Sequence, residues 1–157
     1  MSVRYSDAVG PRRQPEGGGP VQAARDRAIV ALQRVGFVVG AMYVLTLPSR
    51  KSGILRSTPV SIMTMTDERY VAALHGDLEW VQDARACGRG TLQRGRVDER
   101  VVLTEIPAHE RTPILRQIPT RLPALAPEFR RTYGIDADPE SFARLAARCP
   151  VFRVERG

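Results

Sequence analysis

Short stretches in which apolar and polar residues alternate recur along the chain, and a period of two is typical of β-strands. In one such stretch, Val60 and Ile62 share one face while Ser61 and Met63 share the other. Glycine, proline and charged residues separate these stretches. The pattern predicts six strands, at residues 42–47, 59–66 (with a start as early as Ser57), 69–75, 91–93, 96–106 and 151–155.

Close connections indicate that neighbouring strands pair as antiparallel hairpins. Residues 48–53 join the first two strands, Asp67-Glu68 the next two, and Arg94-Gly95 the fourth and fifth. Six short, mostly antiparallel strands favour a small barrel or a strongly curved sheet, because closure leaves few free edges. We therefore expect an α+β fold in which such a barrel carries peripheral helices.

A helix is predicted for residues 78–87, between the third and fourth strands. Asp77 stands where a capping side chain would accept a hydrogen bond from the first helical turn. The run Gly88-Arg89-Gly90 ends the helix. Spacing of i, i+4 and i+7 predicts an inward face made of Trp80, Ala84 and Cys87.

The segment at residues 108–133 is helical in character, but four prolines interrupt it. Proline breaks the interior of a helix, so we expect several short helices joined by proline turns. Asp138-Pro139-Glu140 then has the composition of a helix start, with a capping Asp and a proline at the first helical position. The buried face of that last helix is predicted to contain Phe142, Leu145, Ala146 and Cys149.

Residues 1–24 are rich in glycine and proline and predict a disordered arm, which leaves residues 25–157 as one domain. Residues 23–39 predict a helix whose second half is apolar nearly all round. Such a helix acts as a lid over the core or as an anchor at a membrane surface, and its short polar face favours the lid. No apolar run approaches the ~20 residues of a membrane span.

The net charge of +7 indicates an anionic partner: nucleic acid, an anionic lipid surface or a small polyanion. The arginines are scattered, and aromatic residues make up only 6% of the chain, too few for a base-stacking surface. We therefore expect no nucleic-acid partner. Cys87 and Cys149 lack the spacing of a metal site, so we expect two small apolar side chains, a reduced cytoplasmic setting and no metal.

Lys51 is the only lysine in the chain. It lies between Arg50 and Ser52 in the first connection, and Arg56 follows shortly after. A compact ammonium beside guanidinium groups in a glycine-containing turn suits a phosphate ligand. The alternative is a solvated basic turn that binds nothing.

The run LTLPSRKSGILRSTPVS at residues 45–61, followed by a hairpin, the helix EWVQDARACG and the hairpin GTLQRG, resembles the deazaflavin-dependent nitroreductase family. The resemblance covers residues 42–106 well. It implies an α+β split β-barrel of about six strands that binds coenzyme F420, an 8-hydroxy-5-deazaflavin. By position, it implies cofactor contacts from the first connection (Arg50, Lys51, Ser52), the second strand (Arg56, Ser57, Thr58, Pro59, Val60, Ser61), the end of the third strand (Ala73, Leu74, His75, Gly76) and the helix (Glu79, Trp80, Val81, Gln82, Asp83).

The chain also departs from that family. The family usually has Asn where this chain has Asp83. An acid facing an anionic cofactor is unfavourable, so we expect Asp83 to pair with Arg50, Arg56 or Arg85. The family's longer loop before Trp80 and its tyrosine-rich helix are also missing, which affects the substrate side of the site more than the cofactor side.

In such a protein the cofactor donates hydride, so the protein needs to orient it rather than to supply a nucleophile. The candidates for a proton donor are His75, Ser61, Tyr43 and Tyr133, or a water molecule. Each has a plainer interpretation: His75 as a half-exposed polar residue, Tyr133 as a packing residue. Trp80 is either a cofactor wall or part of the core.

These observations lead to one hypothesis and two alternatives. The hypothesis is an oxidoreductase that uses reduced F420 to deliver hydride to an electron-poor quinone, enone or nitro compound. The alternatives are an FMN-binding split-barrel reductase and a non-enzymatic F420 carrier or anion-binding module. We expect a cytoplasmic monomer or homodimer, with peripheral membrane association as a further possibility.

Overall fold

The computed structural model describes residues 42–157. The predicted arm at residues 1–24 and the predicted helix at residues 23–39 lie outside the described residues. Within residues 42–157, no helix has the length and apolar character that crossing a membrane requires.

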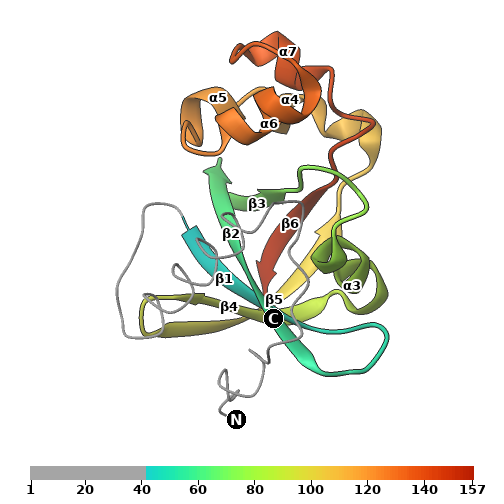
Figure 1. The fold of residues 1–157 in the computed structure, drawn as a ribbon. Helices are drawn as coiled ribbons and strands as arrows, with labels where there is room; N and C mark the ends of the chain where they lie inside the picture. The colour runs from blue at the N-terminus through green and yellow to red at the C-terminus, as the bar shows by residue number, and fades with distance from the viewer. Residues whose placement is uncertain (1–41) are drawn as a thin grey trace.

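Six antiparallel strands close into a barrel in the order β1-β2-β3-β6-β5-β4 (Figure 1). Each strand is hydrogen-bonded to two neighbours, so the ring has no terminal strand. The predicted α+β barrel of six antiparallel strands is thereby confirmed. The strands are β1 (Met42–Pro48), β2 (Leu55–Met65), β3 (Glu68–Ala72), β4 (Arg89–Arg94), β5 (Val97–Glu105) and β6 (Val151–Arg156).

Two hairpin turns are shifted by one residue from their predicted places. The β2–β3 connection is Thr66-Asp67 rather than Asp67-Glu68, and the β4–β5 connection is Gly95-Arg96 rather than Arg94-Gly95. Thr66 and Asp67 both have positive φ, 49° and 63°, which a two-residue turn of the I′ type requires. A turn signal in the sequence located each hairpin, but the register of the strands decided which two residues form the turn.

The second and third strands also differ in extent from their predictions. β2 begins at Leu55, ahead of both predicted starts, Ser57 and Pro59, because Leu55 already pairs with Pro48 of β1. β3 ends at Ala72 rather than His75, so residues 73–78 form a loop that leads into α3. This loop belongs to the candidate site.

The buried residues form two clusters, one inside the barrel and one under the short helices. Inward residues of the strands, such as Leu45 and Ile62, fill the barrel together with Trp80 and Val81 of α3 (Glu79–Cys87). Figure 1 shows the other α-helices gathered at one end of the barrel, apart from α3. These elements are η1 (Ala108–Glu110), α4 (Thr112–Leu115), α5 (Ile118–Arg121), α6 (Ala126–Tyr133) and α7 (Pro139–Ala143).

The proline-rich segment forms short helices, as predicted. Each of α4, α5, α6 and α7 has a proline in its first two positions, where a missing N–H costs no helical hydrogen bond. Asp138 caps α7 as expected, because its Oδ1 accepts a hydrogen bond of 2.8 Å from the Ser141 N–H. Phe142, Leu145 and Cys149 are buried beneath this layer.

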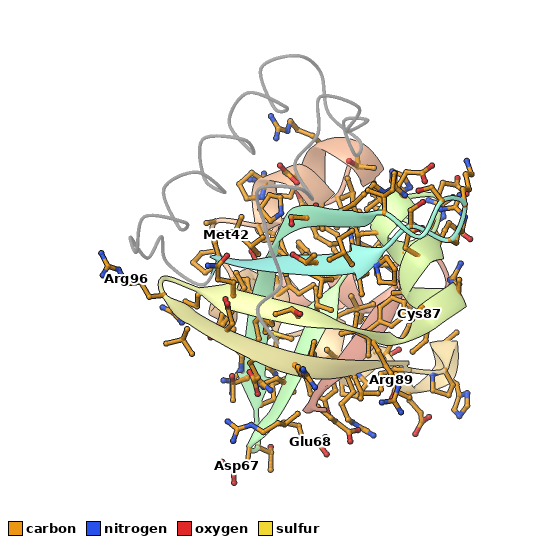
Figure 2. The ribbon with its side chains drawn as sticks, turned by 90° about the horizontal axis from the view of Figure 1, so that it is seen from below. Met42, Asp67, Glu68, Cys87, Arg89 and Arg96 are labelled. Carbon is orange, nitrogen blue, oxygen red and sulfur yellow. The ribbon has the colours of Figure 1, made fainter. Side chains whose placement is uncertain are left out.

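Two predictions about α3 were wrong. Asp77 does not cap the helix: the cap position is Leu78, which makes no side-chain cap, and the Asp77 N–H donates to His75 Nδ1 at 3.3 Å. Cys87 is exposed rather than inward, because the helix ends there and the chain turns into β4 beside Arg89 (Figure 2). Trp80 and Ala84 do face the core as predicted.

Gly90 in β4 gives a direct test of the barrel's packing. A Cβ at Gly90 would lie 2.4 Å from the Thr46 carbonyl oxygen and 2.6 Å from Leu47 Cδ2 on β1. Because the β1 backbone is held in the sheet, we expect Gly90→Ala to lower the free energy of unfolding by about 2 kcal/mol or more in urea titrations. Gly157→Ala, whose Cβ would have no neighbour closer than 3.5 Å, is the control. Equal midpoints for the two variants would contradict the close approach of β1 and β4.

Candidate anion-binding site at the β1–β2 turn

The connection between β1 and β2 is a compact turn at residues 49–54, which we name the basic turn. Its ends are tied together because the Ser49 N–H donates to the Ile54 carbonyl and the Gly53 N–H to the Ser49 carbonyl, both at 2.8 Å. Gly53 has a φ of 75°, which few other residues adopt without strain. The turn therefore presents Arg50, Lys51 and Ser52 at the surface.

Two arginines and two acids join the basic turn to α3, and we name these four residues the charge cluster. Arg50 comes from the turn and Arg56 from β2, while Glu79 and Asp83 lie one helical turn apart on α3. Arg50 Nη1 donates to Glu79 Oε2 at 2.9 Å and to Asp83 Oδ1 at 3.0 Å. Arg56 Nη2 donates to Glu79 Oε2 at 3.2 Å and to Asp83 Oδ2 at 2.6 Å.

The two acids differ in burial. The Asp83 side chain is 2% exposed, and its Oδ1 also accepts the Arg50 backbone N–H at 3.0 Å. The Glu79 side chain is 25% exposed. The expected pairing of Asp83 with arginine is confirmed for Arg50 and Arg56, whereas Arg85 pairs with Glu105 instead. Asp83 thus links the basic turn to α3 through its bonds to Arg50 and Arg56, and its buried side chain does not face a ligand.

The charges of the cluster stabilise one another. Hydrogen bonds from Arg50 and then Arg56 lower the pKa of Glu79, and the bond to Glu79 is the main cause that raises the pKa of Arg50. Burial acts to lower the pKa of Arg56, but its bonds to Asp83 and Glu79 outweigh burial and raise the pKa. Two positive and two negative charges cancel here, while the Lys51 ammonium has no ion pair within residues 42–157.

β2 and β3 separate before the part of β2 that carries Arg56. Their ladder ends at the pair Ile62–Val71, and the chain beyond β3 follows β6 instead, with the Ala73 N–H donating to the Pro150 carbonyl at 2.8 Å. Residues 55–61 therefore pair with β1 alone in the described part of the chain. Pro59, which has no N–H to donate, lies in this half-paired stretch, as a strand proline is expected to. We name the place where β2 and β3 separate, with residues 55–61 on one side and the loop 73–78 on the other, the split.

The predicted cofactor residues fall into two groups. Val60, Ala73, Trp80 and Val81 are in the barrel core, with exposed fractions of 6% or less. Ser57 is 1% exposed, and its hydroxyl is hydrogen-bonded to Thr46 Oγ1 at 2.8 Å. In this conformation the side chains of these five residues are not exposed to a ligand. The residues that are at least partly exposed are Arg50, Lys51, Ser52, Arg56, Thr58, Pro59, Ser61, Leu74, His75, Gly76, Glu79 and Gln82.

Trp80 illustrates the first group. Its ring lies 5.7 Å from that of Phe152, centroid to centroid, at a tilt of 52°, inside the barrel. Of the two interpretations that the sequence left open, the structure supports core packing. The helix positions Glu79 and Asp83 at the turn because Trp80 and Val81 anchor its opposite face.

The proton-donor candidates occupy different surroundings. His75 lies in the loop 73–78 and is partly exposed. Tyr133 of α6 donates its hydroxyl proton to the Leu74 carbonyl at 2.5 Å, and burial is the main cause that raises its pKa. Ser61 donates to Met42 Sδ at 3.2 Å. Tyr43 accepts a hydrogen bond from Arg94 at 3.1 Å. Their catalytic assignments stay predictions, and His75 is the candidate that lies in the loop bordering the split.

Contacts that the sequence did not predict fix the loop 73–78. The Leu74 carbonyl accepts from Cys149 Sγ at 3.4 Å as well as from Tyr133, and burial raises the pKa of Cys149 to about 11. Gln82 Nε2 donates to the Gly76 carbonyl at 2.6 Å. The pairing of Glu79 was also missed, although acids at i and i+4 on a helix after a basic turn were a usable signal.

No three His, Cys, Asp or Glu side chains between residues 42 and 157 come close enough to hold a metal ion. The site is described by its cations and by residues 55–61 of β2, whose strand partner within the described part of the chain is β1.

The chain matches no known family profile and no curated protein sequence. Solved structures do share its architecture. An F420H2-dependent reductase, FDR-A, superposes with a TM-score of 0.52 at 19% identity, over 76% of this chain and 98% of that one. A protein that forms a domain-swapped dimer gives 0.54 at 17% identity, over 87% of this chain and 100% of that one.

A protein of unknown function from Agrobacterium tumefaciens gives a TM-score of 0.53 at 14% identity, over 94% of this chain. This chain spans only 59% of that protein's length. Such likenesses establish the architecture and nothing about the ligand. The fold is a split β-barrel.

The contacts of the charge cluster predict that substituting Asp83 strongly lowers the free energy of unfolding. Asp83→Asn keeps the shape but removes the buried charge that two arginines share, and breaking a buried ion pair costs about 3 kcal/mol. We expect a loss of that size in the free energy of unfolding, measured by urea titration followed by circular dichroism. Asp136→Asn, at an exposed position, is the control and should change stability by less than about 0.5 kcal/mol. A loss below about 1 kcal/mol at Asp83 would show that the cluster does not hold the turn to α3.

Proposed function

We propose that this protein is an oxidoreductase that binds reduced coenzyme F420 and transfers hydride to an electron-poor organic substrate, such as a quinone, enone or nitro compound. The observation that carries the proposal is the convergence of Arg50, Lys51 and Arg56 beside the split of a split β-barrel. The shared fold with an F420H2-dependent reductase supports it.

The donors at the basic turn fit an anionic ligand. Arg50 uses Nη1, and Arg56 uses Nη2, to hold both acids. Within residues 42–157, the remaining guanidinium nitrogens of these two arginines make no hydrogen bond, and the Lys51 ammonium makes none either. The phosphodiester and polyglutamate tail of F420 carry several negative charges, which such donors bind through charge-assisted hydrogen bonds.

The bound coenzyme would supply the hydride, so that two electrons pass from its ring to the substrate and a proton completes the reduction. The chain's own part is to bind and to orient. The basic turn holds the phosphate end, and residues 55–61 of β2 border the split. His75, in the loop 73–78, is the residue we assign to proton delivery.

FMN is the alternative ligand, because its phosphate suits the same turn. The homodimer is favoured over the monomer by the similar fold that forms a domain-swapped dimer. Whether the ligand is F420 or FMN, and whether the protein is a monomer or a homodimer, the cations of the basic turn would bind the phosphate.

Lys51 gives the sharpest test. Adding the purified full chain to oxidised F420 should quench or shift its fluorescence, and excess FMN should not reverse the change. Hydrogen bonds to charged groups contribute about 1.5–3 kcal/mol, so we expect Lys51→Ala to weaken F420 affinity about tenfold or more. Turnover of a quinone with reduced F420 would distinguish an enzyme from a carrier.

Arg96→Ala is the matched control for net charge. Arg96 is an exposed cation at the tip of the β4–β5 hairpin, away from the basic turn (Figure 2). If Lys51→Ala stays within about threefold of the wild type, or if Arg96→Ala weakens binding equally, the phosphate does not bind at the basic turn. Competition by FMN would replace F420 with a flavin as the ligand.

A further inference from the structure

Glu79 lies among the three cations of the site, Arg50, Lys51 and Arg56. One of its oxygens, Oε2, accepts hydrogen bonds from both arginines, at 2.9 Å from Arg50 and 3.2 Å from Arg56. Lys51 also contributes to the field at this carboxylate. A carboxylate oxygen between two guanidinium groups is in the position that a phosphate oxygen would take.

We propose that Glu79 is an internal anion that occupies the place of the ligand's phosphate and is displaced when the phosphate binds. Glu79 would thereby set the affinity and the charge preference of the site. The identity of the ligand rests on the function proposed above, whereas the competition between Glu79 and an anion does not.

The difference between the two acids makes such an exchange feasible. Asp83 is fully buried and binds the Arg50 backbone as well as both guanidinium groups. It keeps the turn attached to α3 when Glu79 leaves. Glu79 is partly exposed, lies in the first turn of the helix and makes no hydrogen bond outside the two arginines within residues 42–157. Its side chain can therefore rotate into solvent without breaking the fold.

The charge balance implies a preference among ligands. With Glu79 in place, three cations face two carboxylates, a net charge of one. A ligand with a single negative charge merely replaces the charge of Glu79. A ligand with several negative charges, or with a phosphate as well as a tail, makes contacts that Glu79 cannot. The site should therefore favour polyanions over simple carboxylates.

The test is the affinity of Glu79→Gln, which keeps the shape of the side chain and removes its charge. One partly exposed ion pair corresponds to about a two- to fivefold change in affinity. We expect oxidised F420, titrated by fluorescence at low salt, to bind Glu79→Gln tighter than wild type by that factor. A purely structural role for Glu79 predicts unchanged or weaker binding, so the sign of the change decides.

Glu105→Gln is a closely matched control. Glu105 Oε2 also accepts from two arginines, Arg85 at 2.8 Å and Arg111 at 3.0 Å, and its side chain is 28% exposed against 25% for Glu79. The two variants therefore change net charge equally and break similar contacts. Equal tightening in both would assign the effect to overall charge and overturn the proposal.

A second probe separates this inference from the proposed function. Inorganic pyrophosphate, followed by the rise in thermal midpoint, should stabilise Glu79→Gln at two- to fivefold lower concentration than the wild type, whether or not F420 binds. If the wild type does not bind F420 but Glu79→Gln still needs less pyrophosphate than the wild type, the proposed cofactor is wrong and the role of Glu79 as an internal anion is supported. If F420 binds and Glu79→Gln gains no affinity for either probe, the internal anion is wrong. If Glu79→Gln does not fold, Glu79→Ala replaces it in the same two titrations, with the same expected direction of change.

Discussion

The ion pairs between the basic turn and α3 are the interaction on which the arrangement of the site depends. The turn is a surface hairpin connection, and such a connection alone would carry three neighbouring cations without a fixed direction. Asp83, buried beneath it, fastens both the backbone and the side chain of Arg50 and orients Arg56 from the adjacent strand. The helix can do this because Trp80 and Val81 hold its other face inside the barrel.

The split is the second condition for a ligand site. A barrel in which every strand pairs along its full length has no backbone groups to offer. Here the chain leaves β2 after Val71 and stays with β6, so a stretch of β2 has one partner instead of two among the described residues. The cations stand at one end of that stretch, and the loop that carries His75 borders it. The topology of the barrel thus places the cations at one end of the part of β2 that β3 leaves.

The sequence predicted the barrel well because alternation and turn signals are local. It placed all six strands, the proline-started helices and the pairing of Asp83 with arginine. It failed where long-range packing decides. β3 ends at Ala72, so His75 lies in a loop rather than in the strand. α3 ends at Cys87, which leaves this residue exposed. The sequence also left open whether Trp80 faces a cofactor or the core, since a helical period cannot distinguish a ligand from a neighbouring side chain, and the structure places Trp80 in the core.

The Leu74 carbonyl accepts two hydrogen bonds, and these determine which substitutions can affect the loop 73–78. It links the loop beside the split to Tyr133 of α6 and to Cys149, both in the separate helical layer. Substitutions in that layer act on the loop through these two hydrogen bonds, whereas Arg50 and Arg56 are held separately by Asp83 and Glu79 of α3. Under the function proposed above, the helical layer would therefore influence the substrate side of the site without altering the charge cluster.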